Sequence, residues 1–313
     1  RVLGKEVERM KKNMIAMAGF LVLTAAVRSD LSWGQIGFGP GQSMDPTEVL
    51  KEARAGNAPG APRIILAGYV AGNDPPAGKP IQAVEWVSIG GGKFTMGTDD
   101  GNDWFKDAKP IHEVNIKTFE MSKTLVTVEQ YAECVIKGGC TQPDTGSYCN
   151  WGVAGRQRHP INCVDWDQAN QYAKFKGARL PSESEYEYAA TSGGKNQKYP
   201  WGNDEPTADK AVYNGNRTQP VCSKPAGNAK VSGGELCDIV GNVWEWVQDK
   251  YQDSYAGAPT DGSAFEGWGS YRVVRGGSFS RFDAGRLRAG LRGDIAPISR
   301  LGVIGFRLAR SSR

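Results

Sequence analysis

Alternating apolar and polar positions predict short strands at the start of the main folded region. The segments Val84–Ile89 and Val114–Phe119 both alternate, and they are separated by the glycine run Gly90–Gly92 and the segment Lys93–Gly97. Strands of this kind are typical of a small antiparallel sheet with one face on a core. The pattern places the beginning of this domain near Ala83.

Helical spacing of apolar residues predicts two amphipathic helices after these strands. The first begins after Thr127, which has the side chain of an N-cap, and the second runs over Asp165–Phe175 and ends before Gly177. A short third helix is predicted from Ser182, because the spacing of Ser182 and Glu185 is that of a capping box.

The remainder of the chain consists mainly of turn signals and short apolar runs. Two main helices packed on a small, irregular antiparallel sheet therefore predict an α+β domain that is rich in loops. The composition agrees, because 41 of the 313 residues are glycine, against an average usage of about 7%. Coiled coils, helical repeats and helical membrane bundles are excluded. The hydrophobic fraction of 39% is enough for a sizeable core.

The first 35 residues have the pattern of an export signal. A short basic stretch, Met10–Asn13, precedes the apolar run Met14–Val27, and an apolar run of roughly 7 to 15 residues is typical of a signal peptide. An uncleaved anchor or an amphipathic segment is the alternative. Residues 36–82 predict a linker or a small N-terminal extension, and the main domain is expected over 83–313, with no stable membrane span after signal cleavage.

Cysteine usage also favours export. The six cysteines are an even number, all lie beyond the predicted signal, and none forms a Cys-x-x-Cys pair. With only two histidines in the chain, disulfides are a better explanation than zinc, and six buried free thiols in a cytosolic protein are the alternative. The pairings that we expect are Cys222 with Cys237 and, most simply, Cys134 with Cys140 and Cys149 with Cys163.

The positive charge of the chain is concentrated at its C-terminal end. The formal net charge is only +4, but the last 38 residues, Gly276–Arg313, contain eight arginines, two aspartates and neither lysine nor glutamate. Such an end suits an anionic partner or a set of internal ion pairs.

An ordered set of short motifs runs along the predicted domain. The motifs are Phe94–Gly97, Lys109–Val114, Val126–Thr127, Ala178–Ala190, Tyr199–Gly202, Gly241–Trp246, Arg275–Ser278 and Gly305–Arg307. Together they resemble the formylglycine-generating-enzyme domain, also called the sulfatase-modifying-factor domain, over about Ala83 to Arg310. The resemblance implies a C-type-lectin-like fold, although the fold alone does not settle an activity.

The catalytic groups of this family are not found in the sequence. Formylglycine-generating enzymes hold copper through two cysteine thiolates just beyond the Arg-Gly-Gly-Ser motif, and soft Cu(I) favours such ligands. Here Phe279–Arg288 contains no cysteine, and none follows Cys237. The related iron enzymes of ergothioneine synthesis need three histidines, and this chain has only His112 and His159. We therefore expect no catalytic cofactor.

Calcium is a structural feature that the resemblance implies for the motif Gly241–Trp246. Asn242 and Glu245, with the backbone carbonyls of Val240 and Val243, resemble a family calcium site made of hard oxygen ligands. The alternative is that Asn242 caps a turn and Glu245 meets a C-terminal arginine.

Two further groups of residues have plain structural explanations. Glu183, Glu185 and Glu187 are explained by helix capping and by positions on a helix surface, without acid–base catalysis. Five tryptophans within motifs are expected to lie in the core, namely Trp151, Trp166, Trp201, Trp244 and Trp246.

The C-terminal segment interleaves two kinds of position. Framework positions lie in family motifs and include Arg286, Arg288, Arg292, Arg300 and Arg307. The other positions show no hydrophobic period and no shared chemistry; they are Ser280, Arg281, Phe282, Asp283, Gly290, Leu291, Gly293, Asp294, Ile295, Ile298, Leu301, Gly302 and Val303.

This interleaving resembles the variable proteins of diversity-generating retroelements, which use the same C-type-lectin-like fold. In those proteins adenines of template codons are replaced, and the products exclude Lys, Glu, Gln, Met and Trp. All five residue types are absent after Trp268. The alternative is that these are ordinary loop and core residues of a divergent family member.

The resemblance thus predicts an exported, non-catalytic ligand-binding protein with a variable binding face over 279–303. Phe282, Leu291, Ile295 and Leu301 would be its apolar anchors, and the framework arginines would hold the loops through internal salt bridges. The expected partner is a protein or another surface ligand, not nucleic acid. The alternative function is a divergent sulfatase-modifying-factor-type enzyme acting in protein or metabolite maturation.

Overall fold

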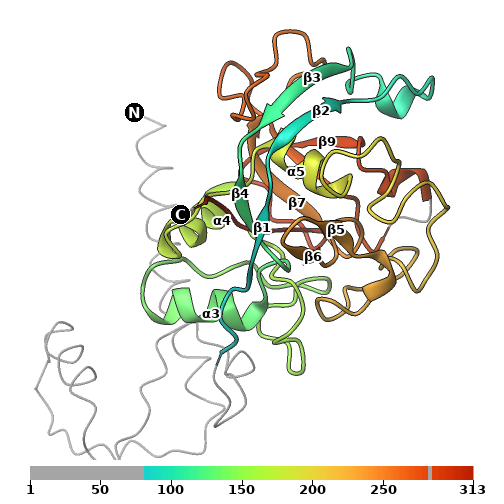
Figure 1. The fold of residues 1–313 in the computed structure, drawn as a ribbon. Helices are drawn as coiled ribbons and strands as arrows, with labels where there is room; N and C mark the ends of the chain where they lie inside the picture. Colours follow the sequence, from blue (N-terminus) through green and yellow to red (C-terminus); the bar gives the residue numbers. More distant parts are fainter. Residues whose placement is uncertain (1–80, 281–283, 313) are drawn as a thin grey trace, which may run out of the picture. The chain divides into compact units, whose positions relative to one another are not determined.

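The computed structural model describes residues 81–280 and 284–312 (Figure 1). The predicted export signal, nearly all of the predicted linker and three of the predicted binding residues, 281–283, lie outside this part of the chain. None of the helices in the described part is long and apolar enough to cross a membrane.

The first predicted strand is confirmed, and the second alternating segment proves to be parts of two strands. β1 (Trp86–Ile89) pairs antiparallel with β4 (Phe119–Ser122), whereas β2 (Gly92–Met96) forms a hairpin with β3 (His112–Ile116). The chain turns between Ile116 and Phe119 and passes from the β2–β3 pair to the sheet that contains β1 and β4. The alternation of apolar and polar residues continues through this turn.

The two ends of the domain meet in one sheet. β11 (Ala309–Ser311) pairs antiparallel with β4, which gives the three-stranded order β1-β4-β11. A second hairpin joins β5 (Ala229–Val231) to β6 (Gly234–Leu236).

A four-stranded sheet carries most of the C-terminal segment. Its order is β10-β7-β8-β9, with β7 (Trp244–Lys250), β8 (Arg272–Arg275), β9 (Arg292–Ile295) and β10 (Ile304–Phe306). β10 runs parallel to β7 and the other pairs are antiparallel, so this sheet is mixed. β9 is an edge strand, which places the residues that follow it at the border of the sheet.

The N-cap predicted at Thr127 and the capping box predicted at Ser182 are confirmed, and Asp165 proves to be the N-cap of the second helix. α3 (Val128–Ile136), α4 (Trp166–Phe175) and α5 (Glu183–Ala190) each begin with a capping box. The short third helix has the central position, because every residue of α5 is buried and the helix contacts β2, β3, β5, β7 and β8 (Figure 1).

All three expected disulfides are present, and no cysteine is free. The tryptophan prediction also holds for four residues of the five, which are at most 9% exposed. Trp201 differs, because it is half-buried and stacks on the ring of Tyr199.

Candidate functional site

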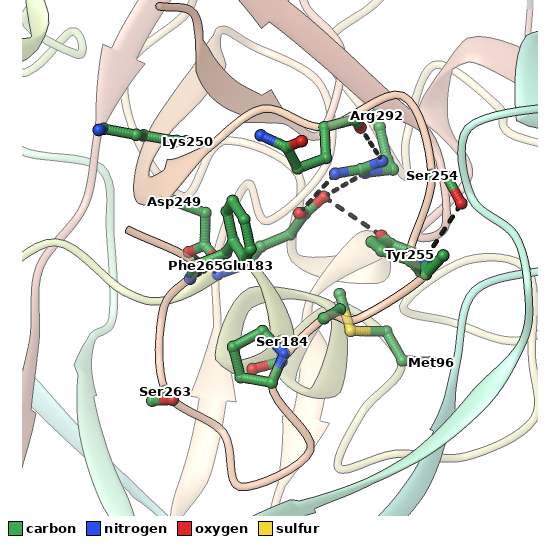
Figure 2. A pocket seen from close by; sticks show the side chains of 14 residues that line it. Met96, Glu183, Ser184, Asp249, Lys250, Ser254, Tyr255, Ser263, Phe265 and Arg292 are labelled. Carbon is green, nitrogen blue, oxygen red and sulfur yellow. Dashed lines mark hydrogen bonds and ion pairs between the residues drawn. The ribbon is translucent and has the colours of Figure 1, made fainter. Parts of the chain in front are cut away.

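Two framework arginines are buried against the acids of α5. Arg275 donates to Glu183 over 2.9 Å and to Glu187 over 2.5 Å. Arg292 makes a two-pronged contact with Glu183, from Nε to Oε1 at 2.7 Å and from Nη2 to Oε2 at 2.9 Å (Figure 2). Glu183 and Glu187 therefore anchor β8 and β9 to α5. The predicted surface position of these two acids is wrong, because the strands cover the helix.

Burial and charge act in opposite directions on the acids of this network. Burial alone would raise the pKa of Glu183, but Arg292 and Arg275 hold it below its ordinary value. Burial, followed by the negative charge of Glu183, raises the pKa of Asp249 to about 8, although the backbone N–H groups of Phe265 and Glu183 donate to it. The carboxylates that line the adjacent cavity (Figure 2) are thus already bonded within the protein.

Most of the other framework arginines also form internal ion pairs, whereas the guanidinium of Arg286 lies over the ring of Trp104 at 4.5 Å. Arg300 donates to Asp165, the N-cap of α4, over 2.8 Å and to Asp144 over 2.9 Å. The remaining pairs are Arg288 with Asp100, Arg307 with Glu245 and Arg310 with Glu120. The predicted internal role of Arg288, Arg292, Arg300 and Arg307 is confirmed.

The predicted binding residues do not all reach the surface. Ser280, Asp294, Ile298 and Leu301 are exposed, and Gly290, Gly293, Ile295, Gly302 and Val303 are half-buried. Leu291 is only 5% exposed and belongs to the main core. Its prediction as an exposed anchor is wrong, because the chain approaches the core here as it enters β9.

The glycines of the predicted face differ in the space that is available for a side chain. A Cβ at Gly302 would lie 2.5 Å from Tyr148 Cβ and 3.0 Å from the Tyr148 carbonyl oxygen, so a side chain there would force a backbone to move. A Cβ at Gly290 would meet nothing closer than Thr98 at 3.6 Å. Gly302 is therefore a packing position, whereas Gly290 has room for a side chain.

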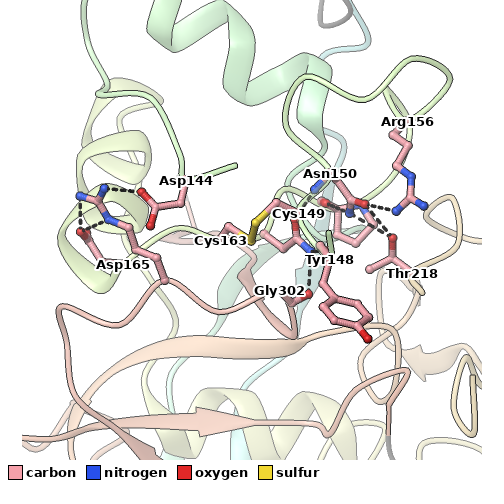
Figure 3. The surroundings of a disulfide bond; sticks show 12 residues. Asp144, Tyr148, Cys149, Asn150, Arg156, Cys163, Asp165, Thr218 and Gly302 are labelled. Carbon is pink, nitrogen blue, oxygen red and sulfur yellow. Dashed lines mark hydrogen bonds and ion pairs between the residues drawn. A yellow bond between two sulfur atoms is a disulfide. The ribbon is translucent and has the colours of Figure 1, made fainter. Parts of the chain in front are cut away.

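The β9–β10 loop, residues 296–303, combines a fixed backbone with exposed side chains. Backbone N–H groups of Trp166 and Cys163 donate to the carbonyls of Pro297 and Leu301, and the Asn162 side chain donates to the Gly302 carbonyl (Figure 3). Ile298 is nevertheless 81% exposed and Leu301 42% exposed. The side chains of Ile298 and Leu301 take no part in the hydrogen bonds that hold the loop.

Tyr148 extends the exposed apolar surface of this loop. It is 61% exposed, lies next to Gly302 and is held through its carbonyl by the Asn162 side chain. Sequence reasoning missed Tyr148 because it stands in a polar turn without a motif. The pairing Cys149–Cys163, which joins this turn to the segment under the loop, was the available signal.

A second hollow region borders the N-terminal part of the predicted face. A groove with about 1650 Å³ of empty space is lined by residues of the segments 95–111, 187–203 and 288–290. Gly290 and Arg288 stand on its border with Lys195 and Lys198, and these two lysines are exposed. Arg292, which follows Gly290 and precedes the β9–β10 loop in the sequence, is buried, so the exposed positions of the predicted face are not continuous along the chain.

The predicted calcium residues do not fit a cation as they are placed here. Both carboxylate oxygens of Glu245 accept from Arg307, at 2.6 and 3.0 Å. The side-chain oxygen of Asn242 accepts from the backbone N–H of Gln219, and its amide nitrogen donates to the Gln219 carbonyl. Within the described ranges, no group of three or more His, Cys, Asp or Glu side chains could hold a metal ion.

Comparison with known proteins agrees with this architecture. The family described as "Sulfatase-modifying factor enzyme 1-like domain" matches residues 73–312. Formylglycine-generating enzyme of Streptomyces coelicolor is 29% identical over 290 residues, which cover 76% of this chain and 92% of that protein.

Two solved structures share the fold. PvdO from Pseudomonas aeruginosa has a TM-score of 0.63 and 32% identity, and the match covers 75% of this chain and 100% of PvdO. Treponema denticola variable protein 1 has a TM-score of 0.56 and 23% identity, over 75% of this chain and 98% of that one. The protein has the α+β, C-type-lectin-like fold of formylglycine-generating enzymes. It belongs to the sulfatase-modifying-factor family.

Proposed function

We propose that this protein is an exported, non-catalytic binding protein that presents its C-terminal segment to a macromolecular ligand. The observation that carries the proposal is the β9–β10 loop, whose backbone carbonyls accept hydrogen bonds from residues 162, 163 and 166 while Ile298 and Leu301 face solvent. Exposed apolar side chains on a fixed loop suit an interface, because little conformational entropy is lost on binding. Ser280, Gly290, Asp294 and Ile295 would complete the face; Leu291 and Gly302 would not take part.

Export is supported by the cysteine chemistry. All six cysteines form disulfides, and such bonds persist mainly in oxidising compartments. A partner met at a cell surface or in an extracytoplasmic space agrees with this placement.

The more specific part of the proposal is that the residues at the exposed positions are diversified. Support comes from the absence of Lys, Glu, Gln, Met and Trp after Trp268, and from the fold shared with Treponema denticola variable protein 1. Backbone contacts that hold the loop do not depend on the identity of residue 298 or 301, so both positions can change while the fold stays intact.

Sequencing this locus in many isolates tests the proposal. We expect substitutions to concentrate at the codons of Asp294, Ile298 and Leu301 and to spare those of Arg292 and Arg300, beside a near-identical template repeat and a reverse transcriptase gene. Substitutions spread equally over both kinds of codon, with no template repeat nearby, would overturn the diversification.

An enzyme of the same family is the second candidate, favoured by the groove at Arg288 and Gly290 and by the identity with a formylglycine-generating enzyme. Copper binding by the purified protein, together with oxidation of a cysteine-containing peptide detected by mass spectrometry, would establish this function and overturn the non-catalytic one. We expect neither, because Phe279–Arg288 offers no thiolate.

A further inference from the structure

A pair of arginines without acidic partners lies beside the binding face. Arg156 is half-buried and Arg217 is exposed, and neither forms an ion pair with any residue between 81 and 280 or 284 and 312. This contrasts with the framework arginines, nearly all of which meet a carboxylate. Positive groups left without a counter-ion on a folded surface are candidates for binding an anion.

Hydrogen bonds fix the position of Arg156. Its Nη1 donates to Asn150 Oδ1 over 2.5 Å, and Asn150 is fully buried. The Asn150 amide nitrogen in turn donates to Thr218 Oγ1 and to the Pro160 carbonyl (Figure 3). Because Arg217 precedes Thr218 in the chain, the same network that orients Arg156 holds the backbone of Arg217 nearby.

Burial and the positive charges of this cluster act in the same direction on Arg156 and His159. Burial, and then the positive charge of Arg217, lower the pKa of Arg156. Burial and both arginines lower the pKa of His159 to about 4, so this histidine is neutral at pH 7. The acid beside this cluster, Glu129, already contacts Arg158 at 3.4 Å and does not compensate the pair.

This cluster lies between the two ends of the proposed binding face. The backbone N–H of Gly215 donates to the Phe279 carbonyl over 2.8 Å, next to Ser280. Asn162 joins the other side, because it accepts from the Asn150 backbone N–H and donates to the Gly302 carbonyl. An anionic group held here would lie at the margin of a ligand bound to Leu301 and Tyr148.

We propose that Arg156 and Arg217 form an oxyanion-binding site that takes a phosphate, sulfate or carboxylate group of the ligand. Two guanidinium groups provide several N–H donors in planar forks, which match such oxyanions. The inference rests on the proposed function for its biological ligand, whereas the site itself is testable with inorganic ions.

Titration of the full chain with sodium sulfate, sodium phosphate and sodium acetate, at constant ionic strength kept with chloride, tests the site. We expect a saturable shift of the Arg156 side-chain N–H resonance in ¹⁵N NMR spectra. The affinity should fall about tenfold or more in Arg217→Gln, since charge-assisted hydrogen bonds are lost. Arg158→Gln is the matched control, because Arg158 lies on the same loop and has an acidic partner.

The three ions separate the possible sources of the group. Preference for sulfate and phosphate over acetate would assign a dianionic ester, and equal binding of acetate would assign an acidic side chain. A shift that does not saturate, or that is unchanged in Arg217→Gln while the melting temperature is also unchanged, overturns the site. These readouts do not involve Ile298 or codon variation, so failure here is distinct from failure of the proposed function.

Discussion

Two arginine–carboxylate clusters hold the C-terminal segment, and they differ in their exposure to water. Around Arg292 and Glu183 the side chains are 2% and 5% exposed (Figure 2). Around Arg300 and Asp144 they are 35% and 54% exposed (Figure 3). A buried ion loses its hydration and depends on its partner, whereas an exposed ion is still solvated when its partner is removed. The ion pair of Arg292 is therefore needed to hold β9 in place, whereas the β9–β10 loop should tolerate the loss of the Arg300 ion pair.

The comparison explains why the predicted binding residues behave differently although they alternate along one short segment. Leu291 and Gly302 are fixed by packing, and Arg292 by ion pairing. By contrast, Ile298 and Leu301 belong to a loop whose backbone is held by hydrogen bonds from Trp166 and Cys163, so their side chains are not needed to hold it. Exposed positions that can accept a substitution thus lie beside positions that packing or ion pairing fixes.

Replacing the arginine of each cluster by methionine gives the largest expected difference in the free energy of unfolding. Arg292→Met leaves Glu183 buried with one guanidinium fewer, and breaking a buried pair costs about 3–5 kcal/mol. Arg300→Met should cost about 1 kcal/mol or less, because Arg300 and Asp144 are exposed to water and the buried Asp165 still accepts from the backbone N–H of Gln168. Urea unfolding at pH 7 measures both. Equal losses in the two variants would contradict the comparison.

A matched pair of glycine substitutions gives a smaller contrast. Gly302→Ala brings a Cβ against Tyr148 and should cost about 1–3 kcal/mol through overpacking. Gly290→Ala meets only ordinary contacts and should change the free energy of unfolding by about 0.5 kcal/mol or less. Thermal unfolding of both variants tests this, and an unchanged melting temperature for Gly302→Ala would mean that position 302 can carry a side chain of the binding face.

The last effect concerns pH and lies at His159, beside Thr218. The pKa of His159 is about 4 in the folded protein, against 6.5 as the ordinary value. As the pH falls, the unfolded chain binds this proton first, so stability present above about pH 6.5 is lost toward about pH 4.

His159→Gln removes this titration. Urea unfolding at pH 7 and pH 5 should show that the variant loses less stability than the unmodified protein over that interval. An identical loss in both would mean that His159 is not shielded from protonation. Added sulfate should reduce the difference if an anion offsets the charges of Arg156 and Arg217.

Features that depend on neighbouring residues were predictable from the sequence. Thr127, Asp165 and Ser182 begin helices because their side chains accept from backbone N–H groups three residues later. Disulfides that span 6 to 15 residues were predictable for a similar reason, since their partners are close along the chain. The motif set also indicated the family and its fold.

Partners far apart in sequence were not predictable. Glu183 contacts Arg292 across 109 positions, and nothing local distinguishes this acid from one on a helix surface. The prediction of Leu291 as an exposed anchor was wrong for the same reason, because its burial depends on how β9 packs against β8 and the core. Tyr148 gave no local signal, and its exposure beside Gly302 depends on a loop that is distant in sequence.

The sequence by itself determined the helices and their caps, the disulfides, the family, and the absence of cysteine where copper would be held. Those properties follow from spacing and from residue chemistry over a few positions. Only the tertiary structure decided which of residues 279, 280 and 284–303 face water, that Glu245 is bonded to Arg307, and that Arg156 and Arg217 have no acidic partner among the described residues. The physical reason is that exposure and ion pairing depend on which distant segments the fold brings together.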